Sequence, residues 1–141
     1  MKRIVSLVLA VFISVMIALP CLAAELSAPM EEEITVYDLY TNYVKSNVAI
    51  SSSGSVYYSC QVNGKSNCTK ISAYAYLQEY RNGSWTNVDC VTKEVSGKSL
   101  FVSDTYTGIS GRNYRCEVHV YTYSGTKYEY IETTSSTVKK S

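Results

Sequence analysis

An alternation of apolar and polar residues with a period of two runs through most of the chain after Val44, and it constrains the fold more than any other feature. Apolar side chains occupy every second position in residues 71–77 and again in residues 114–120. Successive side chains of a strand point to opposite faces, so this pattern predicts strands with one buried face. No segment here repeats at the spacing of an amphipathic helix, and we therefore expect an all-β domain.

Short turn signals divide this region into segments. Asn63-Gly64 and Asn82-Gly83 are the strongest two-residue hairpin signals, and Ser96-Gly97 and Ser124-Gly125 are further turns. They predict about seven short strands, with the later ones near residues 55–62, 71–80, 85–91, 99–106, 112–123 and 127–134. The expected fold is an antiparallel β-sandwich, and a small closed barrel is the alternative with the same alternation.

The first 24 residues have the organisation of a secretory signal peptide. Lys2 and Arg3 precede an apolar run over residues 4–19, Pro20 follows, and small residues up to Ala24 offer a cleavage site. An uncleaved membrane anchor is less consistent, because the run is shorter than the ~20 residues of a span. Lipidation of Cys21 is disfavoured by the proline before it. We expect a secreted, extracellular protein.

Removal of this segment changes the net charge of the chain and leaves residues 25–141 to be divided into an arm and a domain. The formal charge falls from +1 to about −1 when Lys2 and Arg3 are lost, so no basic surface for nucleic acid is expected. Residues 25–43, with Glu31 to Glu33, are expected to form an acidic leader or an extended arm, and residues 44–138 the β-sandwich. The remaining sequence has no second long apolar run, so we expect no membrane insertion after cleavage. We also expect a monomer.

Tyr114-Arg115-Cys116 resembles the tyrosine corner of immunoglobulin domains, in which a Tyr two residues before a Cys bonds to upstream backbone. The tryptophan departs from that pattern, because Trp85 follows the hairpin turn instead of lying on the third strand. The resemblance is therefore to immunoglobulin or fibronectin type III architecture and not to a true immunoglobulin domain.

Four cysteines remain after cleavage, and in an oxidising compartment they predict two disulfides. The resemblance implies Cys60–Cys116, which leaves Cys68–Cys90. A two-residue turn at Asn82-Gly83 would place Cys90 opposite Ala75, on the order of 23 Å from Cys68, so that second pair requires the chain to leave the hairpin. Cys60–Cys68, across the expected turn at Asn63-Gly64, is the alternative, but it leaves Cys90 and Cys116 without suitable partners. The spacings do not match those of zinc sites, and we expect no metal and no cofactor.

A wider resemblance involves residues 70–86, which contain Tyr76-Leu77-Gln78-Glu79-Tyr80 and Asn82-Gly83-Ser84-Trp85, together with Tyr114-Arg115 and Tyr123-Ser124-Gly125. These segments resemble small secreted single-domain β-sandwich proteins of Gram-positive gut bacteria, a family of unknown function. The resemblance spans about residues 44–138 and implies a fold without implying catalytic residues.

His119 is the single histidine and the one imidazole available as a base. It alternates with Val118 and Val120, so it is expected to face solvent beside Arg115 and Glu117. A catalytic triad would need a nucleophile and an orienting acid around it, and we expect no pair of carboxylates on adjacent strands. The sequence therefore favours a protein that is not an enzyme.

Tyrosines supply the candidate binding surface. If Ile71 to Leu77 alternate into the core, the tyrosines between them face outward together with those of the strand ending at Tyr123, and the last strand adds Tyr128 and Tyr130. The candidate site residues are Tyr74, Tyr76, Tyr80, Tyr121, Tyr123, Arg115 and His119. Such a face suits an extracellular glycan or protein partner. Cross-strand pairs in a purely structural surface protein are one alternative, and an inhibitor of a secreted hydrolase using residues 80–85 is another.

Overall fold

The computed structural model describes residues 39–141, which form eight strands and no helix. The expected signal peptide and most of the acidic arm, residues 1–38, lie outside the described residues. No helix in the described part is long and apolar enough to cross a membrane. The strands are β1 (Thr41–Ile50), β2 (Val56–Gly64), β3 (Lys70–Arg81), β4 (Ser84–Ser96), β5 (Ser99–Tyr106), β6 (Asn113–Ser124), β7 (Lys127–Thr134) and β8 (Val138–Lys139).

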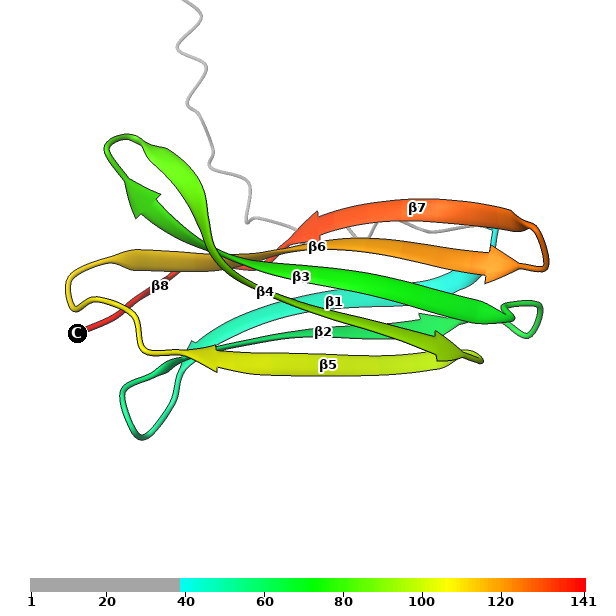
Figure 1. Ribbon diagram of the computed structural model, residues 1–141, viewed down its shortest axis with the longest axis horizontal. Helices are drawn as coiled ribbons and strands as arrows, with labels where there is room; N and C mark the ends of the chain where they lie inside the picture. The colour runs from blue at the N-terminus through cyan, green and yellow to red at the C-terminus, as the bar shows by residue number, and fades with distance from the viewer. Residues whose placement is uncertain (1–38) are drawn as a thin grey trace, which may run out of the picture. The chain divides into compact units, whose positions relative to one another are not determined.

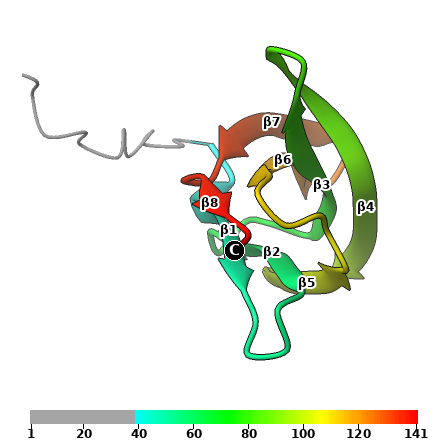
Figure 2. The same ribbon diagram turned by 90° about the vertical axis from the view of Figure 1, so that its left-hand side faces the viewer.

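The strands form two antiparallel sheets that face each other, as both ribbon views show (Figures 1 and 2). The three-stranded sheet has the order β1-β2-β5, and the five-stranded sheet has the order β4-β3-β6-β7 with the short β8 paired to β6. The prediction of an all-β antiparallel fold is confirmed. The two separate sheets form a sandwich-like arrangement and not the closed barrel.

The core lies between the sheets and is made by the alternation read from the sequence. In β6 the buried and half-exposed residues alternate along its full length, and in β2 Val56, Tyr58, Cys60 and Val62 are fully buried. The remaining large apolar members of the core are Val48, Ile71, Leu77, Leu100, Val102, Tyr114, Val118, Val120 and Ile131.

Two predicted boundaries differ from the structure. β1 begins at Thr41, inside the segment expected to be an arm, because the Thr41 hydroxyl is hydrogen-bonded across the sandwich to Thr122 (2.7 Å) and Glu129 (2.9 Å). Asn63-Gly64 is not a turn: Gly64 pairs with Thr41 inside β2. A Cβ on Gly64 would lie 2.6 Å from the Cβ of Cys68, so this glycine is needed for a close approach.

The β3–β4 hairpin turns at Asn82-Gly83 as expected. Both residues have positive φ, 48° and 82°, which is the type I′ turn that matches the twist of the strands. A bulge follows, since Gln78 pairs with Asn87 but Leu77 pairs with Asp89. The extra residue moves Cys90 opposite Tyr76 instead of Ala75, and so onto the outer face of the sheet.

The four cysteines of the described region are free thiols, and neither predicted disulfide is present. Cys68–Cys90 is wrong for a geometric reason: Lys70 pairs with Ser96 and Tyr76 with Cys90, which places the two cysteines roughly 20 Å apart or more along the strands. Cys60 and Cys116 do meet in the core from opposite sheets. The Sγ of Cys116 lies 3.9 Å from the carbonyl of Ser59, and Cys116 contributes to the raised pKa of Cys60.

Tyr114 makes the corner contact that its position predicted. Its hydroxyl accepts a hydrogen bond from the Ile109 amide (2.7 Å) and donates one to Glu79 (2.7 Å). Glu79 is fully buried, and its other oxygen accepts from Nε of Arg81 at 2.7 Å. Burial alone would raise the pKa of Glu79, but the hydrogen bonds from Arg81 and Tyr114 outweigh it and hold the pKa below its usual range.

We expect Glu79→Gln to lower the free energy of unfolding by about 2–3 kcal/mol, because the amide removes the negative charge and leaves one acceptor oxygen for the two donors, Arg81 and Tyr114. The depressed pKa means that Glu79 stabilises the fold above its ordinary pKa of about 4.3, and this contribution is lost as pH falls through the folded value. Urea unfolding at pH 7 and between pH 5 and 3 measures both effects. Glu94→Gln, at a more exposed carboxylate, is the control, and an equal loss in both variants would contradict the assignment.

Thiol reactivity should follow burial. Burial, with a smaller contribution from Cys116, raises the pKa of Cys60 to about 12. Burial also raises the pKa of Cys116. Because the thiolate is the reacting species, a thiol reagent should modify the exposed Cys90 first in the native protein and Cys60 and Cys116 only after unfolding. Peptide mapping after timed labelling measures this order. Rapid native labelling of Cys60 would contradict the packing.

Candidate functional site

Aromatic side chains cover the outer surface of the five-stranded sheet, on the side away from the core. We call this surface the tyrosine face; it consists of Tyr74, Tyr76, His119, Tyr121, Tyr123, Tyr128 and Tyr130. Neighbouring rings lie between 5.0 and 6.3 Å apart, centroid to centroid. The rings form one connected set that crosses β3, β6 and β7.

Strand register explains why the rings meet. Tyr74 pairs with His119 across β3 and β6, while Tyr121 pairs with Tyr130 and Tyr123 with Tyr128 across β6 and β7. Directly opposed residues share a face and bring their side chains into contact. The tyrosine face was predicted from alternation alone, and the geometry brings together Tyr74, Tyr76, Tyr121, Tyr123 and His119 as expected.

A shallow hollow of about 290 Å³ opens on the tyrosine face. It is lined by Ser72, Tyr74, Tyr76, Glu94, His119, Tyr121 and Tyr123. Its polar wall is organised, because the Ser72 hydroxyl donates to Glu94 (2.5 Å) and Lys70 lies 3.5 Å from the same carboxylate. The hollow therefore offers hydrogen-bonding groups beside aromatic rings.

Two predicted site residues lie apart from the tyrosine face. Tyr80 packs on Trp85 at 5.2 Å, beside the turn at the tip of the β3–β4 hairpin, which extends beyond the body of the sandwich (Figure 1). The Arg115 guanidinium lies 4.4 Å from the centre of the Trp85 ring and its Nε donates to Gln78 at 2.7 Å. These residues form a neighbouring cluster on the same sheet.

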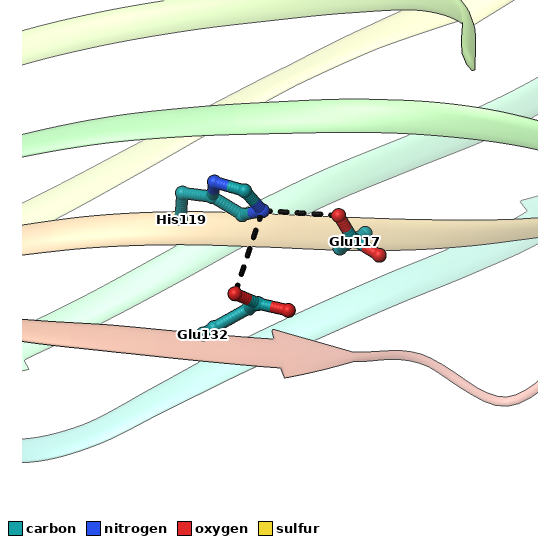
Figure 3. Close-up of side chains that lie close together, drawn as sticks. All are labelled: Glu117, His119 and Glu132. Carbon is teal, nitrogen blue, oxygen red and sulfur yellow. Dashed lines mark hydrogen bonds and ion pairs between the residues drawn. The ribbon is translucent and has the colours of Figure 1, made fainter.

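Glu117 lies beside His119 as expected, but a second carboxylate from the adjacent strand also lies near the ring, and the expectation of no carboxylate pair on adjacent strands is wrong. Glu117 on β6 and Glu132 on β7 lie on adjacent strands with the imidazole between them (Figure 3). The Nε2 atom of His119 is 3.0 Å from Glu117 Oε1 and 3.9 Å from Glu132 Oε2. The hydrogen-bond partner of the ring is a carboxylate and not a hydroxyl or thiol, so this group lacks the arrangement that activates a nucleophile.

Two tyrosines of this face, Tyr76 and Tyr130, have a raised hydroxyl pKa. Burial, and then the hydrogen bond that its hydroxyl donates to Glu132 (2.9 Å), raise the pKa of Tyr130 to about 12. Burial is also the largest cause of the raised pKa of Tyr76. The proton of Tyr130 is thus held by Glu132, and the hydroxyl can still accept a hydrogen bond from a ligand.

Three polar residues of the site were not singled out from the sequence: Ser72, Glu94 and Glu132. Ser72 and Glu94 oppose each other across β3 and β4, and the bulge displaces the register that a plain hairpin would have. Glu132 is two residues after Tyr130, so the alternation already placed it on the outer face. Only its proximity to His119 required the pairing of β6 with β7.

No protein-family model matches the chain, and neither the curated proteins nor the solved structures gave a match. The tyrosine face and its hollow are accordingly the features on which a function can be proposed.

The hydrogen bond between Tyr130 and Glu132 can be tested directly. Glu132→Gln should lower the pKa of Tyr130 toward its ordinary value, because the neighbouring negative charge that opposes ionisation is removed. NMR titration of ring-labelled tyrosine measures this shift, with Tyr130→Phe to assign the signal. Glu94→Gln should leave that signal unchanged, and a Tyr130 pKa unaltered in Glu132→Gln would count against the contact.

Proposed function

We propose that the chain is a secreted, non-enzymatic binding module that captures an extracellular glycan through the tyrosine face. The observation that carries this proposal is the connected set of rings around a hollow with polar groups. Sugar rings have apolar faces bordered by hydroxyls, so a site for them needs aromatic surface and hydrogen-bonding groups side by side. The hydrogen-bonding groups are Glu94, Ser72 and His119, and they lie beside the rings of Tyr74 and Tyr121.

Exposure of the rings supports a ligand over a purely structural role. Tyr74 is 39% exposed and Tyr130 is 44% exposed, although each already contacts other rings of the face. Cross-strand pairing accounts for the edges in contact, but it leaves this aromatic area open to solvent. A bound glycan would cover it.

The signal-peptide features of residues 1–24 support secretion. The segments of residues 70–86, 114–115 and 123–125 support the resemblance to small secreted β-sandwich proteins of Gram-positive gut bacteria. Within that resemblance we favour the fibronectin type III-like arrangement. In constant-type immunoglobulin domains the fourth strand belongs to the sheet of the first two, whereas here β4 pairs with β3.

Inhibition of a secreted hydrolase through the β3–β4 hairpin is the second candidate. Its support is the extension of the hairpin beyond the sandwich (Figure 2) and the 42% exposure of Tyr80. Against it, the Arg81 guanidinium is engaged by the buried Glu79 and Trp85 is covered by Arg115. Arg81 and Trp85, the two side chains that would anchor such a loop in an enzyme, therefore make contacts within the domain instead.

Replacing Tyr76 and Tyr121 by Ser should weaken glycan capture at least tenfold, because both rings line the hollow. The mature protein and the double variant would be compared on a glycan array and then by calorimetry with the best glycan. Circular dichroism and thermal unfolding verify that the fold is retained. Binding that is unaffected in the folded double variant would contradict the proposal.

Tyr43→Ser is the matched control, since Tyr43 is a 36% exposed tyrosine on the three-stranded sheet. It should bind like the unaltered protein. A screen of secreted hydrolases and surface proteins, run in parallel, distinguishes the alternatives. Capture of a surface protein, without binding to any glycan on the array, would favour a protein partner. Inhibition of a hydrolase that is lost in Tyr80→Ser would favour the inhibitor hypothesis.

A further inference from the structure

The group formed by Glu117, His119 and Glu132 has the composition of a metal site. Their nearest ligand atoms, one imidazole nitrogen and two carboxylate oxygens, all lie within 4.8 Å of one another. Two of these separations are 3.0 and 3.9 Å, both from the Nε2 atom of His119 (Figure 3). Donors around a four-coordinate zinc ion with bonds of about 2.0–2.2 Å lie roughly 3.3–3.5 Å apart, so small side-chain movements suffice.

The backbone presents these three residues to one point. His119 pairs directly with Glu132 across β6 and β7, and Glu117 is two residues before His119 on the same face. Sites built on paired strands hold their ligands more rigidly than sites on loops. The three side chains are also only partly exposed: 29% for His119, 20% for Glu117 and 53% for Glu132.

Surrounding hydrogen bonds orient the two carboxylates. Glu132 Oε2 accepts from the Tyr130 hydroxyl at 2.9 Å, and Glu117 Oε2 accepts from Gln78 Nε2 at 3.3 Å. The imidazole is held between the rings of Tyr76, at 5.2 Å, and Tyr130, at 5.9 Å. Supporting contacts of this kind fix the orientation of metal ligands and affect metal affinity by about 10–100-fold.

Charge and donor type decide which ion would fit. Two carboxylates face one imidazole, and Arg115, 3.9 Å from Glu117, offsets only part of their charge. Calcium and magnesium prefer all-oxygen sites, whereas an imidazole nitrogen with carboxylates suits zinc and neighbouring transition metals. Three protein ligands leave a fourth position open toward solvent.

We propose that Glu117, His119 and Glu132 bind a divalent transition-metal ion, with zinc preferred, on the edge of the tyrosine face. This site goes beyond the glycan-binding proposal and does not depend on it. His119 lines the hollow, so a bound ion would present its open position next to the aromatic rings. A ligand with a hydroxyl or carboxylate oxygen could then reach both.

The experiment uses the mature protein carrying a purification tag without histidine. Zinc chloride titrated by calorimetry should bind at one ion per chain, and calcium chloride should bind at least tenfold more weakly. Because the sequence contains a single histidine, the imidazole NMR signals report on this site alone. They should shift on zinc addition and return on chelation.

Glu132→Gln and His119→Gln should each reduce zinc affinity at least tenfold while circular dichroism shows a retained fold. Asp104→Asn, at an exposed carboxylate on β5 of the three-stranded sheet, is the matched control and should bind normally. Cys90→Ser removes the exposed thiol and should also leave the affinity unchanged.

Three results would overturn the proposal: no binding of zinc, binding that both site variants retain, or binding that is lost in Cys90→Ser, which would assign the ion to the thiol. Glycan capture is measured separately on zinc-free protein. Failure of the tyrosine-face variants there and failure of zinc binding here are therefore distinguishable.

Discussion

The antiparallel pairing of β3 with β6 is the interaction on which both faces of the five-stranded sheet depend. It runs without a shift from Lys70 opposite Tyr123 to Glu79 opposite Tyr114. A slip of β3 by one residue against β6 would turn Ala75 toward solvent and Tyr74 and Tyr76 into the core. The same register brings the buried carboxylate of Glu79 to the hydroxyl of Tyr114, so the core and the outer face are aligned by one set of backbone hydrogen bonds.

Polar groups at the end of this pairing add specificity to an apolar core. Glu79 is fully buried, yet its oxygens are used by Tyr114 and Arg81. The Tyr114 hydroxyl also accepts from the Ile109 amide, which ties the β5–β6 connection to the sheet. A slipped register would leave the carboxylate without partners in the core, at a cost well above that of a lost apolar contact.

The outer face of the five-stranded sheet places aromatic rings and potential metal ligands next to each other. The hollow between Tyr74 and Tyr121 offers rings and hydrogen bonds, and the Glu117–His119–Glu132 group offers metal ligands. His119 belongs to both, since its ring contacts Tyr76 and Tyr130 while its Nε2 contacts the carboxylates. A ligand that covers Tyr76 and Tyr130 would therefore lie next to the Glu117–His119–Glu132 group as well.

The sequence by itself determined the strands, the tight turn at Asn82-Gly83 and the outward direction of the tyrosines, because alternation and turn chemistry are local properties of the chain. Local patterns do not report on partners distant in sequence, and the errors follow from that limit. The bulge at the register shift between Leu77 and Gln78 moved Cys90 to the outer face, and the turn expected at Asn63-Gly64 became strand when Thr41 paired with Gly64. Only the tertiary structure brought Glu132 beside His119 and Tyr114 to the buried Glu79, since those contacts arise from pairing between separate strands.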